Sequence, residues 1–289
     1  MKPTTGENIF YAINYFILSL FGLSCLLPLM HIAALSLSDL NAITSGIVGI
    51  WPKGWSIDSY VSLIHGTRIV SAFKNSVIIT VVGTALNMVF TIIAAYPLSR
   101  SYFYGRRFYT LAIVFTMLFG AGIIPNYLLV KSLGLVDTYG ALWLPGVVSA
   151  WNLLVLKSFF EHIPEELQEA ATIDGAGDWR LILQIIIPLS LPAIATLTLF
   201  YGVGHWNSFM NVLIYINDST KMNLSVMVQQ MIASQQLVSE ISTMEDSLSV
   251  TPESVKSAGV FVMIVPMMLV YPFLQKYFVK GVMIGSIKG

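Results

Sequence analysis

Charged side chains are scarce in this chain. Of its 289 residues only 10% are Asp, Glu, Lys or Arg, whereas 56% are hydrophobic, and the mean hydropathy is +0.76. An ordinary soluble domain carries about 25% charged residues, so this chain lacks the polar surface that a soluble protein of its length needs. The composition therefore predicts a membrane protein.

A net basic charge and paired cysteines are also missing. Lys and Arg number 15 and so do Asp and Glu, which excludes the basic surface with which proteins hold nucleic acid. The single cysteine, Cys25, lies inside an apolar run without a partner. Neither an intrachain disulfide nor a Cys-based zinc site can form, and we expect no metal site.

Catalytic and nucleotide-binding motifs are absent from the sequence as well. The four histidines, at positions 31, 65, 162 and 205, form no His-Glu-x-x-His motif, and no Gly-x-Ser-x-Gly elbow occurs. The sequence therefore offers no catalytic motif for an intramembrane enzyme. No Gly-Lys pair exists, so the chain has no phosphate-binding loop and we expect it to bind no cofactor.

Long uncharged apolar runs are abundant. About 20 such residues are needed to cross a membrane as a helix, and six runs approach or exceed this length, at 9–35, 77–98, 108–130, 142–156, 181–203 and 260–273. The fourth and sixth are the shortest and extend into amphipathic sequence. We therefore expect an all-α fold in which residues 1–289 form a single domain with six transmembrane helices.

The first run has no small-residue cleavage site, so we interpret it as a retained helix rather than a signal peptide. The loop 99–107 contains Arg100, Arg106 and Arg107 without an acidic residue, and short basic loops lie in the cytoplasm. With six crossings both termini are then cytoplasmic, including the tail at 276–289. Two longer loops, 36–73 and 205–257, are then expected on the extracytoplasmic side of the membrane.

The cytoplasmic segment 161–180 has the pattern of a short helix followed by a tight turn. Pro164 suits the start of a helix, and the acidic residues that follow it complement the positive helix N-terminus. Gly175 can take the left-handed conformation that ends a helix, and Asp178 is expected to cap the next helix. An ordinary amphipathic surface helix beside the membrane would share these features.

The order of residues resembles a specific family. Glu169-Ala170-Ala171, then Gly175, then the run 185–188 ending in proline is similar to the Glu-Ala-Ala motif of permease subunits of ATP-binding-cassette importers. That pattern ends Ile-x-Leu-Pro, and Ile187 stands here in place of the leucine. The resemblance implies a coupling helix that docks on a separate ATPase subunit, with the roles carried by Glu169, Ala170, Ala171, Asp174, Gly175 and Gly177.

The resemblance extends along most of the chain. The carbohydrate branch of these permeases is similar to this chain at residues 75–76, 95–100, 124–129 and 135–140. The C-terminal segments 271–281 and 285–289 are similar to the maltose-type second permease that serves aldouronate, rhamnogalacturonan and alginate oligosaccharides. This implies a bacterial cytoplasmic (inner) membrane protein that works with a second permease, an ATPase dimer holding ATP and Mg, and an extracytoplasmic solute-binding protein. The implied substrate is an oligosaccharide.

Other residues are candidates for the translocation path and for moving parts. Polar and aromatic groups at membrane depth often line a pathway; here they are Asn152, Tyr201, Trp206, Asn207 and Asn211, together with Asn87 and Asn126. Asn87 can instead join helices, and Trp206 can anchor at the membrane interface. Pro188 and Pro192 mark either a hinge or a static kink. In the tail, Lys280 and Lys288 are candidates for ATPase contact or for proximity to anionic lipid.

Two alternatives within transport remain open from the sequence. The importer could carry a non-sugar solute such as a metabolite or a peptide. A carrier that needs no ATP is disfavoured, because the spans contain no Asp, Glu, Lys or Arg to relay ions or protons.

Overall fold

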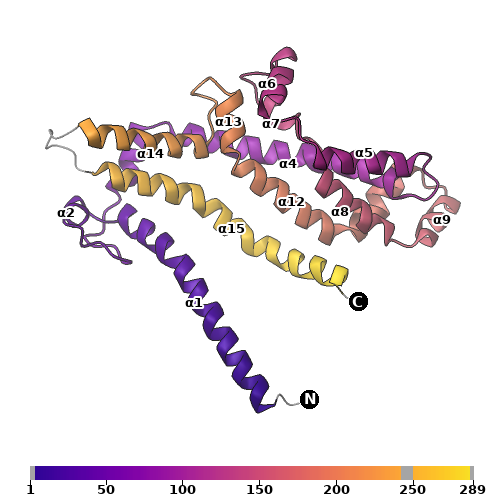
Figure 1. Cartoon of the computed structure of the whole chain (residues 1–289), viewed down its shortest axis with the longest axis horizontal. Helices are drawn as coiled ribbons and strands as arrows, with labels where there is room; N and C mark the ends of the chain where they lie inside the picture. The colour runs from indigo at the N-terminus through magenta and orange to yellow at the C-terminus, as the bar shows by residue number, and fades with distance from the viewer. Residues whose placement is uncertain (1–3, 242–249, 287–289) are drawn as a thin grey trace. The chain divides into compact units, whose positions relative to one another are not determined.

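The computed structural model describes residues 4–241 and 250–286, and within these ranges the regular structure is entirely helical (Figure 1). By its internal contacts the chain divides into two compact units. The first comprises residues 1–70 and 228–265, and the second 71–227 and 266–289. Helices α14 (Leu224–Ile241) and α15 (Pro252–Ser286) each run from one unit into the other.

The first unit is built on α1 (Thr5–Ser36), α2 (Leu40–Thr44) and α3 (Asp58–Gly66). A capping box starts α1: the Thr4 hydroxyl accepts from the Glu7 N–H, while the Glu7 carboxylate accepts from the Thr4 N–H. The end of α1 packs through Ala34 on Ala42 and Ile43 of α2. The rest of α1 exposes its apolar side chains, as expected of a helix that meets lipid or another protein.

The second unit contains the remaining helices. They are α4 (Ile69–Ser99), α5 (Arg106–Leu118), α6 (Ile123–Ser132), α7 (Gly140–Trp143), α8 (Ala150–Glu161), α9 (Glu165–Ile173), α10 (Asp178–Leu181), the π-helical turn η1 (Ile182–Ile186), α11 (Ile187–Leu189), α12 (Leu191–Trp206) and α13 (Phe209–Tyr215). Helix α8 packs against both α5 and α12.

Two apolar clusters hold this unit together. The larger joins α4, α8, α9 and the helices from α10 to α12, with Leu156, Phe160, Ile186 and Leu197 at its buried centre. The smaller brings Ile79 of α4 to Val212 of α13 and Val226 of α14. Each cluster therefore connects segments that lie far apart in the sequence.

Three described helices are long and apolar enough to cross a membrane: Gly6–Ser36, Ile69–Ser99 and Pro252–Pro272. They contain the runs 9–35, 77–98 and 260–273. Two bent pairs raise the number to five if each pair is one span. The expectation of several membrane helices in an all-α fold is thus confirmed, and the count of six stays a prediction.

Three of the expected spans are interrupted rather than continuous. The run 108–130 forms α5 and α6, which bend by 116° where Gly120 and Gly122 allow the chain to turn, the latter with φ +84°. The run 181–203 bends by 85° between Leu189 and Leu191. The run 142–156 is divided between α7 and α8, because Pro145 and Gly146 fall between them.

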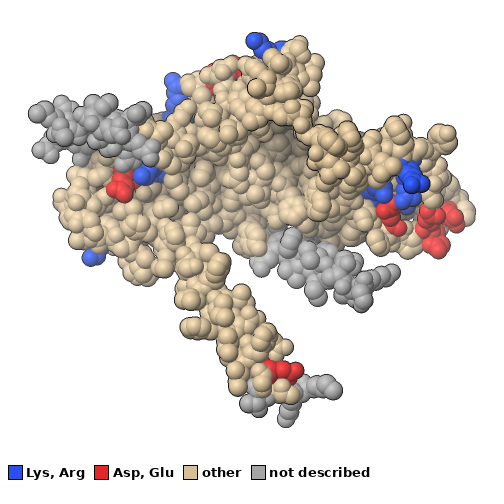
Figure 2. Space-filling model, viewed as in Figure 1, with Lys and Arg blue, Asp and Glu red and all other residues tan. Residues whose placement is uncertain are grey.

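Charged side chains gather at the end of the second unit that carries α5, α8 and α9, as Figure 2 shows. A second group of charged side chains shows near α6 and α13, and the visible surface between the two groups is largely free of Lys, Arg, Asp and Glu. This distribution fits a protein whose middle is surrounded by lipid.

Candidate functional site

The segment predicted to couple the membrane helices to an ATPase forms helix α9. Its first turn carries Glu165 and Glu166, which complement the helix N-terminus. Glu165 accepts a hydrogen bond from the Ser101 hydroxyl at 3.0 Å, and the Gln168 amide donates to the Tyr102 hydroxyl at 3.1 Å. One face of α9 is thereby attached to the loop that follows α4.

The end of α9 is a Schellman turn. Gly175 has φ +78°; its N–H donates to the Thr172 carbonyl at 3.0 Å, and the Ala176 N–H donates to the Ala171 carbonyl at 2.9 Å. The expectation that Gly175 ends the helix is confirmed. The expectation for Asp178 is wrong by one position, because Gly177 is the N-cap of α10 and Asp178 is the first residue of that helix.

Much of the remaining surface of α9 and of the turn that follows it is open to the surroundings. Glu169, Ala170, Asp174, Gly175 and Gly177 are all exposed. Two apolar side chains stand beside them: Ile173 is 86% exposed and Trp179 is 65% exposed. Apolar groups left this open beside charged groups are characteristic of a surface that another protein covers.

The buried face of α9 ties it to the membrane helices. Ala171 is 7% exposed and belongs to the same cluster as Phe160 of α8 and Leu197 of α12. Ile163, just before α9, is part of it as well. Helix α9 therefore shares one close-packed core with α8 and α12.

The chain between α9 and α12 contains the two candidate hinge prolines. Pro188 lies in α11 after a π-helical turn, and Pro192 lies in the first turn of α12. Between them, the Ser190 N–H donates to two carbonyls, those of Ile186 and Ile187, each at 3.0 Å, while the buried Ser190 hydroxyl bonds to no group in the described part of the chain. The kink is present in this structure, and hinge motion stays a prediction.

A second site is a pocket of about 430 Å³ in the second unit. It gathers side chains from α4, α6, α7, α8, α12 and α13. They are Asn87, Asn126, Ala141, Leu142, Pro145, Gly146, Ser149, Asn152, Phe200, Tyr201, Gly204, His205, Ser208, Asn211 and Tyr215. Its volume falls in the range of roughly 300–1,000 Å³ that is typical of ligand pockets.

Hydrogen bonds fix the polar groups of this pocket in place. The Asn87 amide donates to the Gly146 carbonyl at 2.9 Å, and its oxygen lies 2.9 Å from Nε2 of His205. The Tyr201 hydroxyl lies 2.8 Å from the Thr91 hydroxyl and accepts from the Ser149 N–H at 3.0 Å. The lining thus combines ordered amides and hydroxyls with aromatic rings, and it contains no Asp, Glu, Lys or Arg.

A glycine makes room for this arrangement. A Cβ on Gly83 of α4 would lie 2.6 Å from Nε2 of His205, which is closer than real Cβ atoms approach other groups. Gly202 of α12 faces the same helix with more space, since a Cβ there would lie 3.7 Å from the Thr84 hydroxyl. Only at Gly83 does the position of His205 require glycine.

Three of the five residues predicted for the translocation path line the pocket: Asn152, Tyr201 and Asn211. Trp206 is 6% exposed and packs edge-on against Phe73, with ring centroids 6.0 Å apart. Asn207 is exposed beside the end of α12 but is not among the lining residues. The structure therefore brings part of the predicted set together.

Sequence reasoning missed His205, Ser149 and Ser208 as pocket residues. His205 lies two residues beyond the end of the apolar run 181–203, so its place near membrane depth was a usable signal. Ser149 lies at the N-cap of α8, where its hydroxyl accepts from the Asn152 N–H. Asn87 does join helices, as one interpretation held, and it also lines the pocket.

The part of the predicted long outer loop that precedes residue 242 is folded. The Asn75 amide donates to the carbonyls of Thr220 and Met222 at 2.8 and 2.9 Å, and the Ser76 hydroxyl accepts from the Leu224 N–H at 2.8 Å. The motif at 75–76 thus attaches the chain before α14 to the start of α4.

Asp137 holds the same segment from the other side. Its carboxylate accepts from the N–H groups of Asp218 and Asn217, at 2.9 and 3.1 Å, and pairs with Lys221 at 3.2 Å. The N–H of Asp218 above all, and then Lys221, lower the pKa of Asp137 below its ordinary value. The exposed pair itself contributes little to stability.

The remaining sequence expectations concern the tail and metal ions. Lys280 lies in α15, but its side chain is outside the described part of the structure, and Lys288 falls outside the described residues altogether. Among residues 4–241 and 250–286, no group of three His, Cys, Asp or Glu side chains could hold a metal ion.

Comparisons with known proteins agree with this picture. Residues 87–284 match the family described as "Binding-protein-dependent transport system inner membrane component". The chain is 41% identical over 284 residues to the polygalacturonan/rhamnogalacturonan transport system permease protein YtcP of Bacillus subtilis (strain 168), covering 98% of this chain and 99% of that protein.

Solved structures show the same similarity. One chain belongs to a bacterial ABC transporter involved in the import of the acidic polysaccharide alginate; the TM-score is 0.87 and the identity 30%, over 96% of this chain and 99% of that one. Another comes from a bacterial alginate ABC transporter in complex with an alginate pentasaccharide-bound periplasmic protein. It shares the fold, with a TM-score of 0.57 and 15% identity, over 92% of both chains.

Proposed function

This chain belongs to the family of binding-protein-dependent transport system inner membrane components, and from that membership we propose that it is a permease subunit of an ATP-binding-cassette importer for an oligosaccharide. The resemblance seen in residues 169–188 is confirmed by the family match. As a transport subunit the chain performs no chemistry itself, and hydrolysis of ATP with Mg takes place on a separate ATPase pair.

The pocket lined by Asn152, Tyr201 and Asn211 supports an oligosaccharide as the substrate. Amides and hydroxyls can bond sugar hydroxyls, and the rings of Phe200 and Tyr215 can cover apolar sugar faces. The relative named for polygalacturonan and rhamnogalacturonan points the same way. Since no Lys or Arg lines the pocket, selection for a uronate would have to occur elsewhere, as on a solute-binding protein.

We propose that α9 transmits ATPase movement to the pocket. The exposed residues Glu169, Ala170, Asp174, Gly175 and Gly177 would meet a groove on the ATPase, with Ile173 supplying apolar contact. The buried Ala171 would carry the displacement to α8 and α12, which hold Asn152 and Tyr201 of the pocket. Movement at the kink between Pro188 and Pro192 would let α12 follow.

The remaining partners follow from the same proposal. Residues 1–289 would act as one permease domain beside a second, similar permease in the bacterial cytoplasmic membrane, with both termini in the cytoplasm. The folded segment within 205–257 would face the extracytoplasmic solute-binding protein. A solved relative of the same fold is in complex with such a periplasmic protein.

The coupling role of α9 can be tested with a matched pair of variants. Ile173→Asp places a charge on the exposed apolar residue, whereas Thr172→Asp places the same charge one residue away, on the face shared with Glu165 and Gln168. Full burial of an isoleucine contributes roughly 2 kcal/mol, or about 30-fold in affinity. We expect Ile173→Asp to reduce ATPase recovery on co-purification and to abolish uptake, and Thr172→Asp to do neither.

The oligosaccharide can be tested separately. Co-purification from the native membrane should recover a second permease and an ATPase, and the solute-binding protein of that complex should bind an oligosaccharide in a sugar screen. Recovery of this chain alone, active in uptake without ATP, would contradict the importer. Binding of a peptide or a metabolite instead of sugars would contradict the substrate class only.

A further inference from the structure

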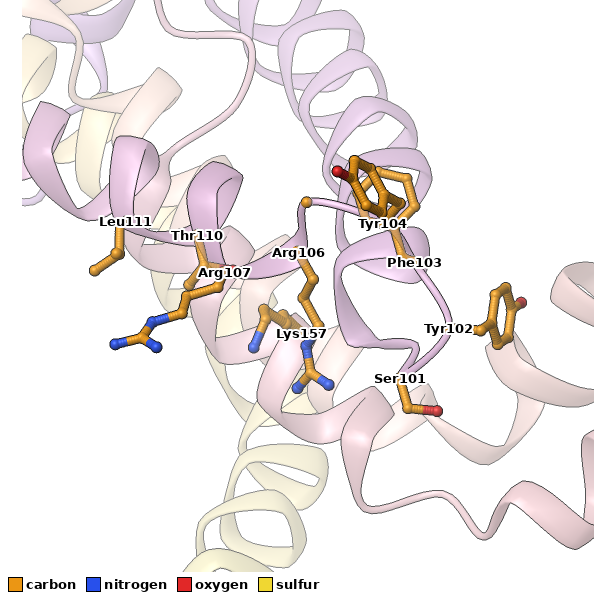
Figure 3. Close-up of a pocket in the computed structure, with 10 residues that line it drawn as sticks. Ser101, Tyr102, Phe103, Tyr104, Arg106, Arg107, Thr110, Leu111 and Lys157 are labelled. Carbon is orange, nitrogen blue, oxygen red and sulfur yellow. The ribbon is translucent and has the colours of Figure 1, made fainter.

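A pocket of about 700 Å³ lies where the first turn of α5 meets the end of α8 (Figure 3). It belongs wholly to the second unit and shares no residue with the pocket around Tyr201. It is lined by Ser101, Tyr102, Phe103, Tyr104, Gly105, Arg106, Arg107, Thr110, Leu111 and Lys157. No acidic residue is among them.

Three cations define the chemistry of this pocket. The side chains of Arg106, Arg107 and Lys157 extend to the same side of the start of α5 in Figure 3. Glu161 pairs with Arg106 and with Lys157, the latter at 2.7 Å, so one carboxylate is shared by two of the three cations, while Glu165 bonds to Ser101. Arg107 makes no ion pair or side-chain hydrogen bond to any described residue, and the cluster therefore retains a positive charge that calls for an anion.

Uncharged donors in the pocket also lack partners. The Thr110 hydroxyl is buried and bonds to no other described group. Gly105 is the N-cap of α5 and provides no side-chain cap, and the first turn contains no acidic residue. The Arg106 N–H donates to the Phe103 carbonyl at 3.2 Å, and no described side chain satisfies the N–H groups that follow it. An oxyanion seated here would pair with Arg107 and would meet N–H groups at the start of α5, whereas the buried Thr110 oxygen lies beneath the surface of the pocket.

The pocket continues onto an apolar surface. Phe108, Leu111, Phe115 and Leu118 recur at spacings of three and four residues, so they share one face of α5, and each is more than half exposed. Helix α5 has no buried residue. Tyr102 and Tyr104 are exposed beside the cations, as aromatic residues are at the boundary between membrane and water.

We propose that this pocket binds the phosphate headgroup of an anionic phospholipid from the cytoplasmic leaflet, with its acyl chains along the exposed face of α5. The basic loop 99–107 places the pocket on the cytoplasmic side, where anionic headgroups occupy basic pockets of membrane proteins. A lipid, rather than free phosphate, accounts for the apolar face next to the cations.

The proposed lipid would sit beside the coupling segment. The loop that lines the pocket also holds α9, through Ser101 to Glu165 and Tyr102 to Gln168. An occupied pocket would order this loop and with it the position of α9. ATP hydrolysis by the assembled importer should therefore rise with the anionic lipid content of the membrane.

The test uses the complete importer in nanodiscs of phosphatidylcholine with increasing phosphatidylglycerol, with bound lipid counted by native mass spectrometry. Arg107→Gln is the principal variant, because Arg107 is exposed and pairs with no described residue, so its loss leaves the fold intact. Arg180→Gln is the matched control: it removes an exposed arginine of the same predicted leaflet outside the pocket. One basic residue near an anionic surface changes affinity by about fivefold.

We expect Arg107→Gln to bind phosphatidylglycerol about fivefold more weakly than the wild type, Lys157→Gln to do likewise, and Arg180→Gln to be unchanged. Equal losses in Arg107→Gln and Arg180→Gln would overturn the proposal, since they would show only a diffuse charge effect. Displacement of the bound lipid by millimolar inorganic phosphate would identify free phosphate as the ligand instead. Cross-links from position 107 to the second permease would show that protein covers the pocket, and would also overturn it.

Discussion

Gly83→Ala is the substitution that most directly tests the geometry of the membrane pocket. The new Cβ would lie 2.6 Å from Nε2 and 2.7 Å from Cε1 of His205, so the imidazole must move by about 1 Å to restore van der Waals contact. Moving it breaks the 2.9 Å hydrogen bond to Asn87 and pushes the ring into the pocket.

The cost follows from these contacts. If the His205 ring stays in place, overpacking the site destabilises the protein by about 1–3 kcal/mol. If the ring turns away instead, the lost hydrogen bond to Asn87 costs about 0.5–1.5 kcal/mol. Replacing glycine by alanine in a helix contributes roughly 1 kcal/mol in the opposite direction. Gly202→Ala isolates that helical contribution, because it lies on the facing helix α12 and its Cβ meets only the Thr84 hydroxyl at 3.7 Å.

The two variants should be compared in the assembled importer. We expect Gly202→Ala to keep or raise the thermal midpoint, measured at one heating rate by intrinsic fluorescence, and Gly83→Ala to lower it. Uptake should fall in Gly83→Ala even at temperatures where the protein is folded, because the ring narrows the pocket. Equal midpoints and equal uptake in the two variants would refute the close approach of α4 to His205.

Three further predictions test other parts of the structure. Gly175 and Gly134 each end a helix with positive φ, +78° and +69°, in open space, so Gly175→Ala and Gly134→Ala introduce the same strain of about 1–2 kcal/mol. We expect only Gly175→Ala to reduce binding-protein-stimulated ATP hydrolysis. Equal losses in the two variants would argue against a coupling role for the turn at Gly175. Asn211→Ala should reduce uptake by about 2- to 12-fold if the amide bonds the substrate, whereas Asn207→Ala, outside the pocket lining, should not; the comparison is made by initial rates at equal protein amounts. Because the folded pKa of Asp137 is lowered, its carboxylate stabilises the folded segment at 215–224 above the unfolded pKa of about 3.9, and this contribution is lost as pH falls through the lower folded value. The opening free energy of that segment, measured by hydrogen exchange, should therefore be constant from pH 8 to 5. Asp137→Asn should lower this free energy at pH 7, and amide exchange in the segment should become faster.

Local patterns in the sequence were sufficient for several features. The uncharged runs identify a membrane protein, because a helix without charges over about 20 residues has few other stable environments. The spacing from Glu169 through Gly175 to Pro188 predicts a short helix, a glycine-dependent turn and the following kink, since each depends on the conformation of a few neighbouring residues. These features appear in α9, the Schellman turn and the bend before α12.

Features that depend on contacts between distant segments required the tertiary structure. Asn87, Asn152 and His205 come from α4, α8 and α12 and meet in one pocket, while Trp206, one residue beyond His205, turns away to pack on Phe73. Helical periodicity cannot distinguish these two neighbours, because the choice depends on the packing of α12 against α4, including the room that Gly83 leaves. The sequence by itself thus determined the class of the protein, its family and the helix, turn and kink of the predicted coupling segment, and only the three-dimensional packing decided which polar residues share the pocket.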